Sequence, residues 1–141
     1  MWRYFTSFAC GIAIGIVVDK IVQYFKINKK ARYSSVLEDC FGEPMFSNTF
    51  TVADVRDWSG AREEQLRSGN KIVVMKAIPK RIEELGKKLD IGNGVENYLI
   101  MAVVNEANKE IVESLLIKYE NLDEKLENRL KDGDGAMIIE G

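Results

Sequence analysis

The longest uncharged stretch of the chain lies close to its N-terminus. Residues 4–18 carry no Asp, Glu, Lys or Arg. A helix over them would be about 22 Å long, and the neighbouring apolar residues extend it to about 35 Å, enough to cross a hydrocarbon core of about 30 Å. Aromatic side chains, which favour membrane interfaces, stand at both ends of the extended stretch: Trp2, Tyr4, Tyr24 and Phe25. The pattern predicts a single transmembrane anchor over residues 1–25.

Basic residues are concentrated on the C-terminal side of this stretch. Only Arg3 precedes it, and the basic residues that follow it are Lys20, Lys26, Lys29, Lys30 and Arg32. Because positive charges favour the cytoplasmic side, we expect a single-pass protein of the cell membrane with a cytoplasmic C-terminal domain. Residues 26–35 then form a basic juxtamembrane linker. The candidates for contact with anionic lipid headgroups are Lys26, Lys29, Lys30 and Arg32.

Two other interpretations of the N-terminal stretch stay open. A cleaved secretion signal would release a secreted domain, but no small-x-small cleavage site follows Val18. A helix lying flat on the membrane surface is the other alternative. The anchor is favoured over both.

Small residues recur every four positions within the predicted anchor. Ser7, Gly11 and Gly15 would form one smooth stripe on a helix. Such a stripe lets two membrane helices approach closely. It makes these residues candidates for helix packing in a homodimer.

The first elements after the linker are predicted from helix and strand signals. Ser35 is expected to cap a short helix over residues 36–41, and Met45 to Phe50 is expected to be extended. Thr51 and Asp54 match a capping box, which starts a helix of about 17 residues that ends at Gly69-Asn70. Within it, Trp58 is expected to anchor the helix on the core, whereas Asp54 and Asp57 are expected on a solvated face.

A strand–helix–strand unit follows. Residues 71–78 contain a β-prone apolar run, and Pro79 suits the first turn of a helix that Gly92 and Gly94 end. Tyr98 to Val104 is apolar throughout, which is typical of a strand buried on both faces.

Residues 106–131 allow two interpretations. Their apolar residues recur at the spacing of one helix face, so that one long helix is possible. A hairpin is favoured, with a polar turn over residues 105–109, a second strand over residues 111–119 and a separate helix capped by Asn121. Residues 136–140 close the domain as a last strand.

The element order from Lys71 onward is then β-α-β-β-α-β. We therefore predict an α+β protein in which the transmembrane helix precedes a small ferredoxin-like domain, residues 36–141, with an extra N-terminal helix. With one long helix the order becomes β-α-β-α-β, with a more parallel sheet.

The segment from Lys71 to Met101 resembles small-molecule-binding regulatory modules of the ACT type. Both have a strand, a Pro-started helix, a Gly-rich turn and a strand, although Lys80 stands where that family has Gly after the Pro. The resemblance covers about 30 residues and implies a likeness of fold, and no family is assigned from it.

Charge is divided unevenly along the chain. Residues 1–32 contain six Lys/Arg and one Asp, a net charge of +5, and the remaining 14 Lys/Arg and 21 Asp/Glu give −7. Nucleic-acid binding depends on basic patches, so an acidic domain argues against a nucleic-acid partner.

The chain lacks the residues that several kinds of catalytic and metal site require. It has no His, which excludes Ser-His and Cys-His catalysis and His-ligated zinc. Cys40 has no second thiol outside the N-terminal stretch and is expected to be buried and free. The Asp132-Gly-Asp-Gly135 segment has too few ligands for a calcium loop and is typical of a turn. We therefore assign no catalytic, cofactor or metal residues.

The function that the sequence favours is a non-enzymatic, membrane-anchored module. Its α+β domain would bind a protein partner or a small ligand. The alternative is a membrane-tethered enzyme that uses carboxylate or Lys chemistry, since both residue types are plentiful. A perturbed carboxylate or Lys in a pocket would favour the enzyme, and an exposed apolar patch would favour the module.

Overall fold

The computed structural model of the protein describes residues 3–6, 11–27, 33–76, 97–133 and 135–141. Its strands are β1 (Arg3–Thr6), β2 (Met45–Phe50), β3 (Lys71–Lys76), β4 (Tyr98–Asn105), β5 (Glu110–Leu122) and β6 (Ala136–Glu140). The helices in the described part are α1 (Gly11–Ile27), α2 (Tyr33–Phe41), α3 (Val52–Gly60), α4 (Glu63–Arg67) and α6 (Glu124–Asp132).

All the described strands join one mixed sheet in the order β1-β6-β3-β4-β5-β2. β2 runs parallel to β5, and every other neighbouring pair is antiparallel. The α+β class predicted from the sequence is confirmed.

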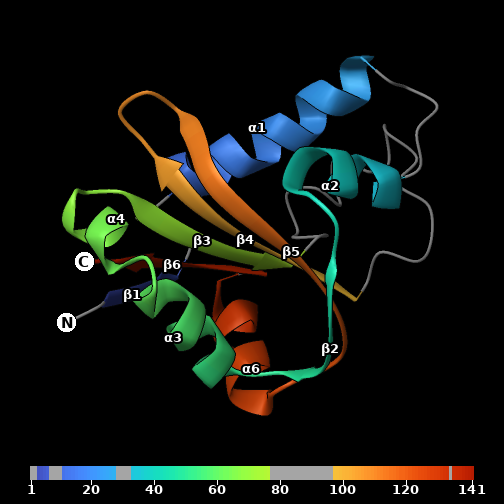
Figure 1. The fold of residues 1–141 in the computed structure, drawn as a ribbon, viewed down its shortest axis with the longest axis vertical. Helices are drawn as coiled ribbons and strands as arrows, with labels where there is room; N and C mark the ends of the chain where they lie inside the picture. The colour runs from blue at the N-terminus through green and yellow to red at the C-terminus, as the bar shows by residue number, and fades with distance from the viewer. Residues whose placement is uncertain (1–2, 7–10, 28–32, 77–96, 134) are drawn as a thin grey trace.

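Helices cover both faces of this sheet, which gives three layers (Figure 1). Side chains alternate along β3: Val73 and Met75 belong to the core shared with α1 and α2, whereas Ile72 and Val74 belong to the core shared with α3, α4 and α6. Both faces of the central strands are therefore apolar. This explains why β4 is buried almost from end to end, as its apolar run predicted.

The N-terminal stretch differs from the predicted architecture. Residues 3–6 form β1, which pairs with β6, and α1 lays one apolar face on the sheet. The residues buried on that face are Ala13, Ile14, Val17, Val18 and Ile21. None of the helices in the described part of the chain combines the length and the apolar character needed to cross a membrane. The structure thus gives the predicted anchor over residues 1–25 no support.

The prediction and the structure differ because a membrane core and the apolar face of a sheet both favour an apolar helix. A helix that covers a wide face of Val, Ile and Met side chains must itself be apolar over much of its surface. Among the side chains of α1 that the structure describes, the exposed polar ones are Asp19, Lys20 and Gln23. A location at the membrane stays a prediction.

The segment before β3 agrees in part with the prediction. Thr51 caps α3 in a capping box, with its hydroxyl oxygen accepting from the Asp54 amide and the Asp54 carboxylate accepting from the Thr51 amide. The expected 17-residue helix is broken into α3 and α4 after Gly60, a weak helix former. Upstream, α2 begins at Tyr33, so Ser35 is not its N-cap.

The hairpin between β4 and β5 is confirmed. The Asn105 side chain accepts a hydrogen bond from the Ala107 amide in the turn, and Lys109 adopts a positive φ of 58°. β5 is longer than predicted because it continues along β2 as far as Leu122. The N-cap position of the next helix is consequently Asp123 and not Asn121, and the Asp123 side chain makes no capping hydrogen bond.

The prediction of a ferredoxin-like strand arrangement is wrong. In a split βαβ unit the two strands joined by the helix are parallel and another strand lies between them. Here β3 and β4 are direct antiparallel neighbours, with Lys71 opposite Val104 and Lys76 opposite Leu99. An apolar run shows that a strand is central, but it does not determine the direction of its neighbour. The helix and turn of the ACT-type resemblance, within residues 77–96, lie outside the described residues.

One polar side chain is buried in α3 without a hydrogen-bond partner in the described structure, the hydroxyl of Ser59. Such a group costs about 1–3 kcal/mol, and Ala is the better helix former. Ser59→Ala is therefore expected to raise the free energy of unfolding by about 1 kcal/mol in urea denaturation. Ser68→Ala is the control, because the Ser68 hydroxyl is exposed and donates to the Gln65 carbonyl, 2.9 Å away. A loss of stability in Ser59→Ala would contradict the prediction.

Candidate binding surface at strand β2

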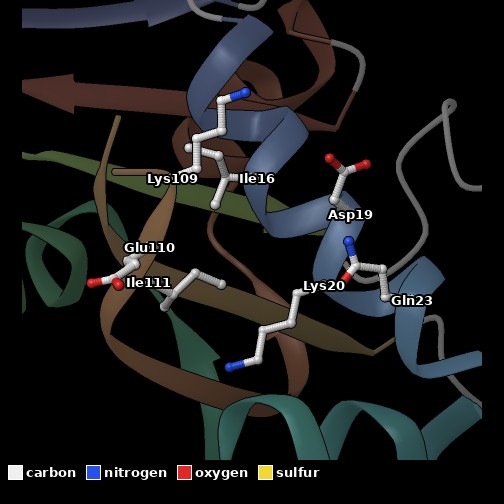
Figure 2. Close-up of a pocket in the computed structure, with 7 residues that line it drawn as sticks. All are labelled: Ile16, Asp19, Lys20, Gln23, Lys109, Glu110 and Ile111. Atoms are coloured by element: carbon white, nitrogen blue, oxygen red, sulfur yellow. The ribbon is translucent and has the colours of Figure 1, made fainter. Parts of the chain in front are cut away.

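A first hollow lies between α1 and the tip of the β4–β5 hairpin. Its volume is about 380 Å³, and it is lined by Ile16, Asp19, Lys20, Gln23, Lys109, Glu110 and Ile111. Figure 2 shows that the charged ends of Asp19, Lys20 and Lys109 point in different directions. Small-ligand sites have polar groups that converge on the ligand. This hollow therefore does not favour a small charged ligand.

The strongest candidate surface is the edge strand β2. It ends the sheet, and β5 is its only neighbour among the described strands. Its sequence, Met-Phe-Ser-Asn-Thr-Phe, contains no charge, although native edge strands are commonly protected by charged residues, Pro or bulges. Phe46 is 74% exposed and Met45 is 45% exposed. Within the described part of the chain no strand pairs with the outer edge of β2, so this edge can accept another strand.

A groove of about 410 Å³ runs beside β2 on the face covered by α3. Its apolar lining comes from β2, from β5, and from α3 with the residue that follows it: Met45, Phe46, Phe50, Trp58, Ala61 and Leu115. Phe50 is buried, whereas Trp58 and Leu115 are half-buried at the border of the core. Trp58 thus packs on the core, as predicted, and also lines the groove.

Arg62 lines this groove and contacts both Glu113 and Trp58. Its Nη2 lies 2.6 Å from Glu113 Oε1 and its Nε lies 2.9 Å from Glu113 Oε2, which is a bidentate pair. The guanidinium carbon lies 3.7 Å from the centroid of the Trp58 ring, and Nη1 donates to the Trp58 carbonyl at 2.9 Å. These contacts hold the indole in place before any partner binds.

Two carboxylates also line the groove. Asp54 accepts hydrogen bonds within the capping box, and Asp57 is exposed with no ion pair among the described residues. Since Glu113 neutralises Arg62, the charge that remains at the groove is negative. The groove therefore combines an apolar lining with an acidic rim.

A smaller hollow of about 370 Å³ involves the same strand near the end of β5. It is lined by Phe46, Ser47, Asn48, Asn97, Lys118, Tyr119 and Glu120. The ammonium of Lys118 lies 5.9 Å from the Phe46 ring centroid and 5.6 Å from that of Tyr98. β2 thus borders two hollows.

The residues singled out from the sequence lie elsewhere. Ser7, Lys29, Lys30 and Arg32 are outside the described residues, and Gly11, Gly15 and Lys26 belong to α1. A Cβ at Gly15 would meet no atom within 4 Å. Neither the helix-packing stripe nor the headgroup contacts are tested, and both stay predictions.

Sequence reasoning missed β2 as a site. The available signal was an uncharged, extended segment with two large apolar residues directly after Pro44. What the sequence did not supply was the position of this segment at the sheet edge.

Cys40 is buried and free, as predicted. Burial raises the pKa of its thiol above the ordinary value; the charge of Lys20 acts in the opposite direction and that of Asp39 adds to the rise. The thiolate is the nucleophilic form, so this environment argues against a catalytic role. In the described part of the chain, no group of three or more Cys, Asp and Glu side chains is placed to hold a metal ion.

Comparison of the chain with protein-family models, curated proteins and solved structures found no match in any of the three. The β2 surface is therefore the feature of the molecule that points to a function.

Proposed function

We propose that the protein is a non-enzymatic binding module that takes up an extended segment of a protein partner along β2. The observation that carries this proposal is an uncharged edge strand with exposed Met45 and Phe46 beside an apolar groove. In strand addition, main-chain hydrogen bonds supply affinity and alternate side chains supply specificity.

The two hollows beside β2 suit this mode of binding. Successive side chains of an added strand point to opposite faces of the sheet. Side chains of an added strand on the α3 side would reach the groove at Trp58, and the hollow at Lys118 borders the same strand. A rigid, already packed indole also lowers the entropic cost of binding.

A location at the cell membrane, with the domain in the cytoplasm, stays a separate proposal. It rests on the basic cluster at Lys26, Lys29, Lys30 and Arg32. It is compatible with the β2 surface, which lies on elements outside that cluster.

The proposal is tested by selecting peptides from a phage-displayed random library on the immobilised full chain. We expect selected peptides to bind at least about tenfold more weakly to the Phe46→Asp variant. A charged side chain at position 46 opposes the burial of this surface under a bound peptide. Val112→Asp is the matched control, since Val112 is also apolar and is 48% exposed on the hairpin.

Two results would contradict the proposal. Either the selection enriches no peptide, or Val112→Asp weakens binding as much as Phe46→Asp does. Circular dichroism of both variants shows whether the fold is retained.

A further inference from the structure

The charge around the β2 groove restricts what kind of segment fits it. We propose that the segment is basic and apolar: one apolar side chain enters the groove against Trp58, and a neighbouring Lys or Arg pairs with Asp57. This inference rests on the proposed function and specifies its partner.

The first step is the balance of charge at the groove. Arg62, the cation in its lining, is already held by both carboxylate oxygens of Glu113. Asp57 is exposed on α3 and has no ion pair among the described residues, and the carboxylate of Asp54 accepts hydrogen bonds within the capping box. A cation on the incoming segment would meet an acceptor there, whereas an anion would be repelled.

The charge of the part of the chain that carries β2 and α3 acts in the same direction. Residues 33–141 carry 14 Lys/Arg and 21 Asp/Glu, a net charge of −7, whereas residues 1–32 carry +5, so that the whole chain carries −2. An acidic surface favours the approach of basic partners over acidic ones. The charge at the groove and the charge of the segment that carries it therefore favour the same class of partner.

A second copy of the chain matches the groove less well than a basic segment does. The β2 strand of a second copy has no cation to offer Asp57. Antiparallel β2–β2 pairing about a two-fold axis normal to the sheet would also place the acidic rims of both copies on the same face. A basic segment of another protein is consequently the better match.

The experiment uses two parallel peptide selections, on the full chain and on its Asp57→Lys variant. We expect peptides selected on the unmodified chain to be enriched in Lys and Arg beside an apolar residue, and this enrichment to disappear with Asp57→Lys. For one selected peptide, Asp57→Asn should weaken binding about two- to fivefold, as for an exposed ion pair. Glu38→Lys is the control, because Glu38 is exposed on α2 on the opposite face, and it should leave binding unchanged.

The outcomes separate this inference from the function on which it rests. Peptides that depend on Phe46 but show no excess of Lys or Arg would overturn the inference and leave the binding module intact. Absence of any enriched peptide would overturn both. A concentration-dependent dimer in sedimentation, dissociated by Phe46→Asp, would identify a second copy as the occupant and would also overturn the inference.

Discussion

Removal of residues 1–27 is expected to abolish the cooperative folding of the remaining chain. The deletion exposes the sheet face that α1 covers and leaves β6 without β1. Burial of a Val or Ile side chain contributes about 1.5–3 kcal/mol, so Ile14, Val17, Val18 and Ile21 together contribute about 6–12 kcal/mol. That is comparable with the whole stability of a typical domain, about 5–15 kcal/mol.

The measurement uses circular dichroism to monitor the urea unfolding of the full chain and of residues 28–141. The full chain should show one sharp transition, whereas the truncated chain should show none and should bind a dye for exposed apolar surface. A sharp transition in residues 28–141 at similar stability would contradict this expectation. It would show that the domain predicted from residue 36 onward folds alone, as it would behind a membrane anchor.

Signals carried by neighbouring residues were interpreted correctly from the sequence. The capping box at Thr51 and Asp54 depends only on contacts three residues apart, and it forms as expected. The hairpin at residues 105–109 depends on turn residues between two apolar runs, and it is also present. Such features need no knowledge of the rest of the chain.

The predictions that the structure does not support are those that distant segments decide. The apolar stretch before Asp19 satisfies both a bilayer and a sheet face, and only the presence of the sheet distinguishes them. The sheet order is likewise a matter of long-range pairing: β2 lies about 70 residues from its partner β5. Its edge position, and with it the candidate site, is invisible to local patterns.

The candidate groove likewise combines local features that the sequence predicts with long-range contacts that it does not. Trp58 was correctly expected to pack on the core, and Asp57 was expected on a solvated face, where it lies. What joins them into one surface is the approach of β2 and of Glu113, which is 51 residues from Arg62. A single sequence offers no signal for a contact of that separation.

Substitution of a single residue on the inner face of α1 should also have a large effect. Ile21 is 1% exposed and belongs to the core beneath α1 and α2, so Ile21→Ala removes buried methyl groups and leaves a cavity. Changes of this kind cost about 2–5 kcal/mol. The free energy of unfolding of the full chain in urea should fall by that amount.

Ile12→Ala provides the matched control, because it makes the same substitution in the same helix at a side chain that is 62% exposed. It should change stability by no more than about 0.5 kcal/mol. If α1 packs on the sheet in solution, the two variants must differ, since only one of the two side chains contributes to the core. Equal and small effects would mean that the apolar face of α1 is buried elsewhere, and a membrane would then be the first candidate.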